Sequence, residues 1–377
     1  MTKRTRTIIF FICLTLFVLG GPSAILYSQG YRLNIGAKEG ENFLTQTGGV
    51  FIKAAPRQVE IYVDGKLKEK TDFLFGSALV ENLLPGKYEI EVRKDDYQSW
   101  TKTLVVKEKE VAEAKNIILF PTKVNFATSL ENVEQIWNTP SQNILIKENT
   151  DDGWVLSFYR PDNQTKRELF KETDINKNGA DLIDIDFSTT TSNTIIGFTI
   201  GKVNKYFEFN HQDTEIEFTE TEKPQKETNY QFGNYDFKLE SESLYFKKIE
   251  EEDFQKLSDS VLKIKLSPDN QKILYFTPHE ISAFFLEDNI TPRKKEGETA
   301  LLMRLTENIN DCVWLNSNYL IFTTKDSINI IELDNRDSVN MVSFKEIKNP
   351  SIAWNEAEKT LYYLSENTLY VSDVLIP

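Results

Sequence analysis

The stretch Leu266-Ser267-Pro268-Asp269-Asn270-Gln271-Lys272-Ile273-Leu274-Tyr275-Phe276 joins a polar turn to an apolar run and decides the fold of the larger part of this chain. Pro and Asp favour turns, because Pro fixes φ and the Asp side chain bonds the backbone that follows it. A short apolar run that contains aromatic residues and is bounded by turn residues indicates a buried strand. The stretch therefore predicts a turn that leads into a strand of a β-sheet.

The same order of an aromatic or leucine residue, a polar turn and an apolar strand recurs from residue 124 onward. It recurs at 136–146, 186–198, 237–246, 313–322 and 353–363. Spacings of about 40–50 residues are typical of the blades of a β-propeller. We therefore expect residues 122–377 to form a β-propeller of about six blades, and one short spacing leaves the number open.

The turn Ser267-Pro268-Asp269 before its apolar strand resembles the propellers of the TolB and WD-repeat type, with Asn270 where Gly is usual. This resemblance implies an architecture and no shared partner.

Residues 48–121 predict a smaller β domain. Apolar and polar side chains alternate along 59–63, and Asp64-Gly65, a dipeptide typical of tight hairpins, follows at once. A second turn at Pro85-Gly86 leads into the same alternation along 88–92. Several short strands with one apolar face each indicate a small β-sandwich.

Two parts of this domain resemble a PEGA domain. They read GGVFIK at 48–53 with VEIYVDGK at 59–66, and LPGKYEIEV at 84–92 with DYQSW at 96–100. Pro56 matches the tetrapeptide that names the family, whereas Arg57, Gln58 and Val59 replace Glu, Gly and Ala. The resemblance implies a non-catalytic module of bacterial and archaeal surface proteins, commonly tied to the cell envelope or the S-layer. It brings no catalytic residues.

The N-terminal stretch has no charged side chain between Arg6 and Arg32. Its apolar part, about 20 residues long, suffices to cross a bilayer as one helix. Lys3, Arg4 and Arg6 precede it, so the positive-inside rule keeps the N-terminus in the cytoplasm. We expect a cytoplasmic tip at 1–6, a transmembrane signal anchor at 7–28, a linker at 29–47 and all later residues outside the cytoplasm.

A cleaved signal peptide is the alternative, because small residues follow the first apolar run at 20–24. We favour retention, because the apolar run resumes at 24–27 and Pro22 disrupts the best cleavage site.

Charge and cysteine content narrow the classes of function. Three of the 44 Lys and Arg lie before the anchor, which leaves 41 against 58 Asp and Glu in the exported part. This acidic balance argues against nucleic acid as a partner. Cys13 lies within the anchor, so Cys312 has no partner for an internal disulfide in the exported part, and its apolar surroundings predict a buried thiol.

No catalytic residues are predicted. The two histidines, His211 and His279, lie far apart in the sequence, and neither is surrounded by residues with metal-ligand spacing. No nucleophile elbow and no phosphate-binding loop occurs in the sequence.

One segment suggests calcium, because alternate side-chain oxygens around a Gly-permitted turn can surround a hard cation. Ile185 stands where a calcium loop carries its last Glu, and a polar turn between strands is the simpler interpretation. The candidate ligands are Asp174, Asn176, Asn178, Asp181 and Asp184.

Four tryptophans, Trp137, Trp154, Trp314 and Trp354, could line a glycan groove. Three of them recur at the same place in the repeat, so we expect them in the core instead.

The sequence thus predicts an all-β ectodomain behind one transmembrane helix, with a non-catalytic binding or scaffolding role at the cell envelope. The partner would be an envelope protein or a polysaccharide. The alternatives are an accessory subunit of an envelope secretion or signalling assembly, and an extracytoplasmic hydrolase with its site in the propeller funnel.

Overall fold

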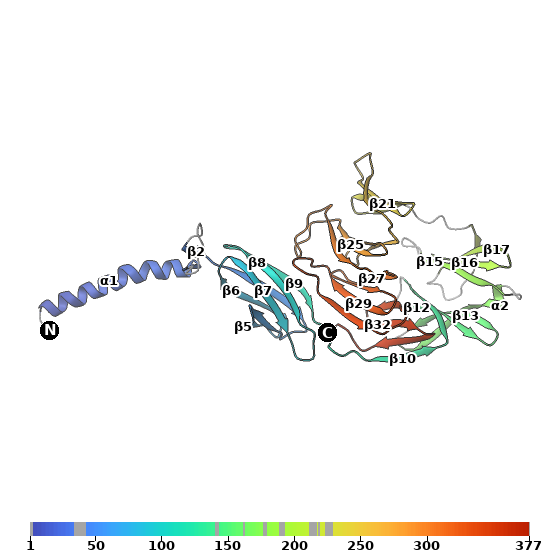
Figure 1. Ribbon diagram of the computed structural model, residues 1–377, viewed down its shortest axis with the longest axis horizontal. Helices are drawn as coiled ribbons and strands as arrows, with labels where there is room; N and C mark the ends of the chain where they lie inside the picture. Colours follow the sequence, from blue (N-terminus) through green and yellow to red (C-terminus); the bar gives the residue numbers. More distant parts are fainter. Residues whose placement is uncertain are drawn as a thin grey trace. The chain divides into compact units, whose positions relative to one another are not determined.

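The computed structural model describes residues 3–33, 43–139, 143–160, 163–175, 179–187, 193–210, 217, 219–222 and 229–376. The chain divides into two compact units. Unit 1 comprises Met1–Thr122 with Arg336–Ser338, and unit 2 comprises Lys123–Asn335 with Val339–Pro377. In the described residues, α1 (Lys3–Ser28) and the single turn α2 (Glu172–Ile175) are the only α-helices, and all other named elements are strands (Figure 1). The prediction of a mostly β chain behind one apolar helix is confirmed.

Helix α1 is long and apolar enough over Arg4–Ser28 to cross a membrane, a criterion that a signal sequence near the N-terminus also meets. Its apolar side chains are exposed, for example Phe17 at 76%. Gly30 ends the helix with a positive φ of 83°, and its N–H bonds the carbonyl of Tyr27 at 3.1 Å. Glycine at this position is the usual way to stop a helix.

The predicted linker contains a short hairpin. Strand β1 (Tyr31–Leu33) pairs antiparallel with β2 (Leu44–Gln46) beside the end of α1 (Figure 1). No alternation or turn dipeptide in the sequence pointed to these three-residue strands.

Besides the β1–β2 pair, the described residues of unit 1 form two sheets. The first has the order β6 (Ser77–Leu83), β3 (Gly48–Ala55), β9 (Val111–Ile118), and β3 and β9 run parallel. The second has the order β5 (Lys66–Lys70), β4 (Glu60–Val63), β7 (Gly86–Arg93), β8 (Trp100–Val106).

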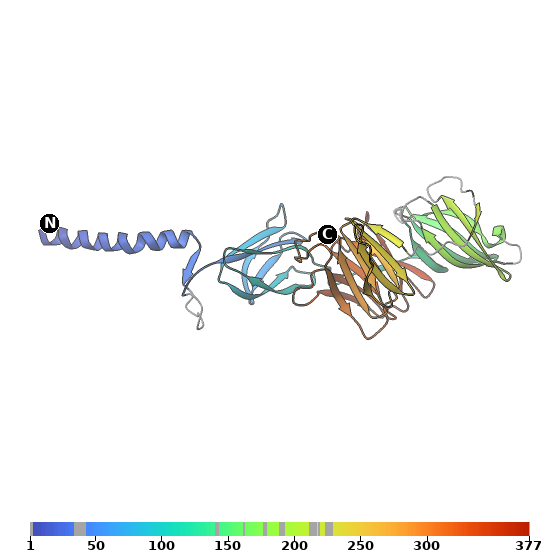
Figure 2. The same ribbon diagram turned by 90° about the horizontal axis from the view of Figure 1, so that it is seen from above.

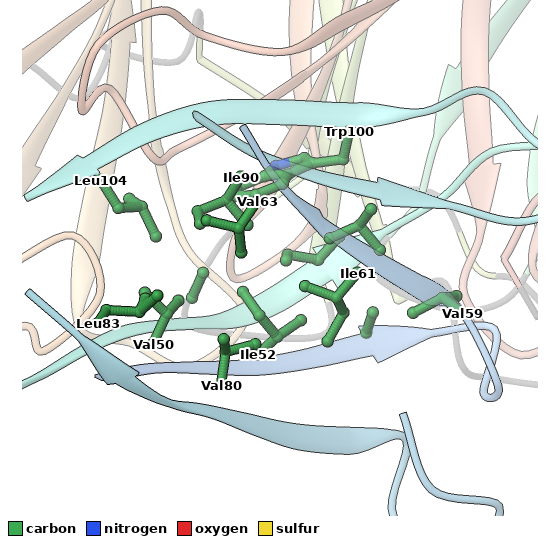
Figure 3. Packing of buried hydrophobic residues seen from close by; sticks show 14 of the residues in the cluster. Val50, Ile52, Val59, Ile61, Val63, Val80, Leu83, Ile90, Trp100 and Leu104 are labelled. Atoms are coloured by element: carbon green, nitrogen blue, oxygen red, sulfur yellow. The ribbon is translucent and has the colours of Figure 1, made fainter. Parts of the chain in front are cut away.

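One hydrophobic core lies between these two sheets (Figure 3). Ile52 of the first sheet and Ile61 and Ile90 of the second are each 0% exposed. Val59 and Val63 are buried with Ile61, so the predicted alternation is confirmed. The Asp64-Gly65 turn has positive φ at both residues, 48° and 73°, as the tight hairpin requires.

Unit 2 contains, among the described residues, six antiparallel sheets of four strands each (Figures 1 and 2). Five follow the chain: β11 (Val133–Asn138) to β14 (Thr165–Lys171), β15 (Asp181–Phe187) to β18 (Thr219–Thr221), β19 (Asn229–Phe232) to β22 (Gln255–Ser258), β23 (Lys263–Leu266) to β26 (Thr299–Arg304), and β27 (Asp311–Asn316) to β30 (Met341–Lys345).

The strands between these bounds are β12 (Ile144–Thr150), β13 (Gly153–Arg160), β16 (Asn193–Ile200), β17 (Val203–Asn210), β20 (Tyr235–Glu240), β21 (Ser243–Lys248), β24 (Lys272–Phe276), β25 (Glu280–Phe285), β28 (Tyr319–Thr323) and β29 (Ser327–Glu332).

The sixth sheet joins the two ends of unit 2. Its order is β10 (Phe126–Glu131), β33 (Thr368–Ser372), β32 (Thr360–Ser365), β31 (Ser351–Asn355). The first strand of the unit thus pairs with the last, from Phe126 opposite Ser372 to Glu131 opposite Thr368. A series of four-stranded antiparallel sheets closed by such a shared sheet is the arrangement of a β-propeller-like fold.

Residues 266–276 form the end of β23, the turn that follows it and β24. Ser267 Oγ donates a hydrogen bond to Asp269 Oδ1 at 2.5 Å, and Lys272 Nζ lies 2.6 Å from Asp269 Oδ2. Asn270 has a φ of 58°. Asn adopts this left-handed conformation more readily than other residues with a side chain, so it can replace the glycine usual at this turn.

Neighbouring sheets of unit 2 share apolar clusters, in which the tryptophans take part. Trp154, 6% exposed, stacks on Phe198 of the next sheet, with ring centroids 5.8 Å apart. Its Nε1 donates to the carbonyl of Ala180 at 2.8 Å. Trp314 is 9% exposed and belongs to a second cluster. The predicted core role is confirmed for these two, whereas Trp137 and Trp354 are partly buried.

Candidate docking surface

The loop between β5 and β6 presents three consecutive large apolar side chains to solvent. Phe73 is 68% exposed, Leu74 65% and Phe75 72%. We call these three residues the apolar tip. Single exposed apolar side chains are ordinary, but a contiguous exposed apolar group is typical of a binding surface.

Asp72 organises this loop through both of its carboxylate oxygens. Oδ1 accepts hydrogen bonds from the backbone N–H groups of Leu74 at 2.8 Å and Phe75 at 2.6 Å. Oδ2 accepts from the N–H and the hydroxyl of Ser77, both at 2.9 Å. These hydrogen bonds, above all that from the Phe75 N–H, lower the pKa of Asp72 to about 2. The carboxylate is therefore charged at neutral pH and holds the tip in one backbone conformation.

Gly76 fixes the base of the loop to the first sheet. Its carbonyl accepts a hydrogen bond from the N–H of Ala54 at 2.9 Å, and its φ is 67°. A Cβ at this position would lie 2.6 Å from the carbonyl oxygen of Ala54. The turn therefore requires glycine, and the hydrogen bond between Ala54 and Gly76 holds the base of the tip against β3.

Two basic residues flank the tip. Arg57 Nη1 donates to the carbonyl of Phe73 at 3.4 Å, and Lys94 Nζ donates to the carbonyl of Arg57 at 2.6 Å. Arg57 is exposed. Positive charge beside the tip contrasts with the net charge of −14 of the whole chain. The surface therefore combines a rigid apolar projection with a basic flank, which suits an apolar pocket with an acidic rim.

This loop was not predicted from the sequence. The signal was the run Asp72 to Gly76, in which a turn-forming Asp and a turn-forming Gly enclose three large apolar residues. The hydrophobicity of Phe73–Phe75 by itself indicates part of a buried strand. Only the positions of Asp72 and Gly76 indicate a loop.

The predicted calcium ligands occupy α2, β15 and the connection between them. Asp174 Oδ2 accepts a hydrogen bond from the N–H of Lys171 at 2.9 Å, and Asp181 begins β15 with an exposed side chain. Asn176, Asn178 and the side chain of Asp184 lie outside the described residues. Calcium binding stays a prediction.

Glu172, which the sequence analysis did not single out, connects this segment to β13. Its Oε2 accepts from the N–H of Trp154 and its Oε1 from the N–H of Ala180, both at 3.2 Å. One carboxylate thus bonds both β13 and the backbone of Ala180, which lies within the candidate calcium loop.

Among the described residues, no group of three or more His, Cys, Asp and Glu side chains could hold a metal ion. His279 is exposed, and His211 lies outside the described part of the chain. Cys312 is 0% exposed, and its burial raises the pKa of the thiol. The prediction of a buried thiol at Cys312 is confirmed, and a thiol in this environment is a poor nucleophile.

Comparison with protein-family models and with curated proteins finds no match for this chain. Among solved structures, the β-propeller domain of Cps50 (Swd1) from Myceliophteria thermophila is similar at 9% identity with a TM-score of 0.39, covering 66% of this chain and 98% of that domain. A luciferin-regenerating enzyme is similar at 11% identity with a TM-score of 0.37, covering 67% of this chain and 95% of the enzyme. Similarity at this level carries no argument about function, so the propeller-like assignment rests on the strand pairing described above.

Proposed function

We propose that this chain is a non-catalytic binding or scaffold protein of the cell envelope. Helix α1 anchors it in the membrane with the N-terminus in the cytoplasm, and the apolar tip docks into an envelope protein. The observation that carries the proposal is the apolar tip itself, with three adjacent side chains that are each about two-thirds exposed on a loop held by Asp72.

The tip is suited to binding because its conformation is set before any partner arrives. Ordering a flexible loop on binding would cost about 0.5–1.5 kcal/mol for each immobilised side chain and more for the backbone. The hydrogen bonds of Asp72 and the contact of Gly76 with β3 remove most of the backbone part of that cost.

A protein is a better partner for the tip than a polysaccharide. Leu74, at the centre of the tip, offers no hydrogen-bonding side chain, whereas sugars are recognised through their hydroxyl groups as well as through stacking. An apolar pocket with carboxylates at its rim would match both the tip and Arg57. This partner class also fits an accessory subunit of an envelope secretion or signalling assembly, which we keep as the second candidate.

The two units take complementary roles in this proposal. We infer that residues 48–121 of unit 1 form the PEGA-like module that presents the tip. The six sheets of unit 2 are then the six blades of one β-propeller, closed by the pairing of β10 with β33. The propeller presents its loops to further partners, and the segment around Asp174 and Asp181 is its candidate calcium loop.

Site-specific photo-cross-linking tests the docking role in the full chain. Benzoylphenylalanine replaces Leu74 in one variant and Leu67 in a control, since Leu67 is also exposed, at 56%, on β5 of the same unit. After irradiation of intact envelopes, we expect a discrete protein adduct from position 74 and none from position 67. Adducts of equal yield from both positions, or no protein adduct from position 74, would overturn the proposal.

The same cells test the topology. Protease added from outside, to cells whose surface is accessible, should digest unit 2 and the part of unit 1 that follows α1, and protection of both would overturn the membrane-anchored part of the proposal.

A further inference from the structure

A second group of exposed apolar side chains surrounds the point where α1 ends. Tyr27 is 64% exposed, Leu33 57%, Phe43 62% and Leu44 40%. Leu33 and Leu44 are directly opposite each other in the β1–β2 hairpin, and Tyr27 lies on the last turn of α1. We call these four residues the collar.

Backbone hydrogen bonds fix the hairpin to the end of the helix. The carbonyl of Gly30 accepts from the N–H of Thr47 at 2.8 Å and from its hydroxyl at 3.0 Å. Gln46 Nε2 donates to the carbonyl of Gln29 at 3.2 Å. Strand β1 begins at Tyr31, three residues after α1 ends at Ser28. The hairpin therefore stays beside the end of the helix.

Arg32 joins the helix, the hairpin and the first sheet of unit 1. Its Nη1 donates to the carbonyls of Tyr27 and Tyr31, both at 2.9 Å, and its guanidinium lies 3.5 Å from the centroid of the Tyr27 ring. Its Nη2 donates to Asn82 Oδ1 at 2.6 Å, next to the end of β6. Thr45 adds a hydrogen bond to Glu108. The collar is thus attached both to α1 and to unit 1.

We infer that the collar lies in the headgroup region of the outer leaflet of the bilayer that α1 crosses. This rests on the proposed membrane anchor, because the end of a spanning helix is at the membrane surface and the hairpin is bonded to that end. Aromatic side chains and arginine are the residues that favour this interface, since an apolar ring and a polar group meet there. Lipid is therefore what covers Leu33, Phe43 and Leu44.

The inference determines which way unit 1 faces. Strand β3 starts at Gly48, next to Thr47, and ends at Ala55, next to Ala54, whose N–H donates a hydrogen bond to the carbonyl of Gly76. Eight residues of strand span roughly 26 Å. The collar and the apolar tip therefore lie at opposite ends of unit 1. A collar held in the headgroups directs the tip away from the membrane, toward a partner in the envelope.

Lipid-quenching measurements test this inference in the full chain with Cys13 replaced by Ala. One introduced cysteine per variant replaces Phe17 within α1, Phe43 in the collar or Phe73 in the tip and carries an environment-sensitive fluorophore. Cys312 stays in place, because its fully buried thiol is shielded from the label. All three side chains are more than half exposed, so labelling disturbs little packing. The protein is reconstituted in phosphatidylcholine–phosphatidylglycerol vesicles with quenchers at shallow or deep positions of the lipid chains.

We expect the label at position 17 to respond most to the deep quencher, and the label at 43 to the shallow one, severalfold more than the label at 73. If the label at 43 is quenched no more than that at 73 while the label at 17 is quenched, the collar inference fails and the anchor stands. If the label at 17 is not quenched either, the anchor fails and the collar inference with it. A label at Leu33 that repeats the result at 43 excludes a local effect of one substitution.

Discussion

Replacing Leu74 and Phe75 by Ser is the sharpest perturbation of the apolar tip. Full burial of a side chain of this size stabilises by about 1.5–3 kcal/mol, and about two-thirds of each is exposed in the free protein. Docking into a pocket can therefore gain about 1–2 kcal/mol from each side chain, and about 2–4 kcal/mol from the pair. Since each 1.4 kcal/mol of binding free energy corresponds to a tenfold change in Kd, the double substitution should raise Kd roughly 30- to 700-fold.

Stability should change far less than affinity. Substitutions of exposed side chains that make no buried contact alter the free energy of unfolding by about 0.5 kcal/mol or less. Asp72 bonds the backbone N–H groups of Leu74 and Phe75, which serine retains, so the loop conformation survives. The Tm of unit 1 should therefore shift by no more than about 4 °C for each substitution.

The assay is a titration of the partner identified by cross-linking against the detergent-solubilised full chain. Leu67→Ser serves as the matched control, because Leu67 is also exposed in unit 1 and should leave Kd unchanged. The docking role of the tip is contradicted if the double variant binds with a Kd within threefold of that of the natural chain. It is also contradicted if Leu67→Ser weakens binding as much as the double variant does. A loss of Tm well beyond that limit would show instead that the tip supports the fold.

Three further outcomes follow from the structure. The pKa of Asp72 is lowered to about 2 in the folded protein, so the stabilisation from its charged carboxylate is complete above the ordinary pKa near 4 and is lost as the pH falls from about 4 to 2. Proteolytic cleavage of the loop should therefore increase over that pH range. In the Asp72→Asn variant, cleavage should show no such increase. Trp154→Phe leaves the buried carbonyl of Ala180 without its indole donor, which should lower the free energy of unfolding of unit 2 by about 1–3 kcal/mol in urea titrations, whereas an unchanged midpoint would contradict that role. Calcium should raise the Tm of unit 2 relative to EDTA by mass action, and Asp174→Ala with Asp181→Ala should remove the shift; an identical Tm with calcium and with EDTA in the natural chain would end the calcium prediction.

Local sequence patterns predicted the strands of this chain where burial and turn chemistry agree. The alternation at 59–63 and the Asp64-Gly65 turn identified a hairpin, because a strand buried on one face repeats every two residues and its tight turn needs positive φ. The stretch 266–276 likewise identified β23, its turn and β24. Both signals depend on residues that are adjacent in the sequence, so they can be recognised without knowledge of the fold.

The candidate site depends on contacts that no local pattern reports. Whether Phe73–Phe75 lie in a core or in solvent is decided by Gly76, whose carbonyl bonds Ala54 more than 20 residues earlier in the chain. The collar depends on Arg32 reaching Asn82, 50 residues away. Long-range pairings of this kind determine exposure, so the sequence indicated where apolar residues occur but not which of them remain uncovered.

The two exposed apolar groups of unit 1 support different kinds of binding because of what holds them. The tip is fixed by one carboxylate and one glycine at the end of β3 that lies farther from α1. The collar is fixed to the last turn of α1 by Arg32 and Gly30, so it stays beside the end of that helix. With α1 as the proposed membrane anchor, these attachments favour a lipid partner for the collar and a protein partner for the tip, since the two groups lie toward opposite ends of β3.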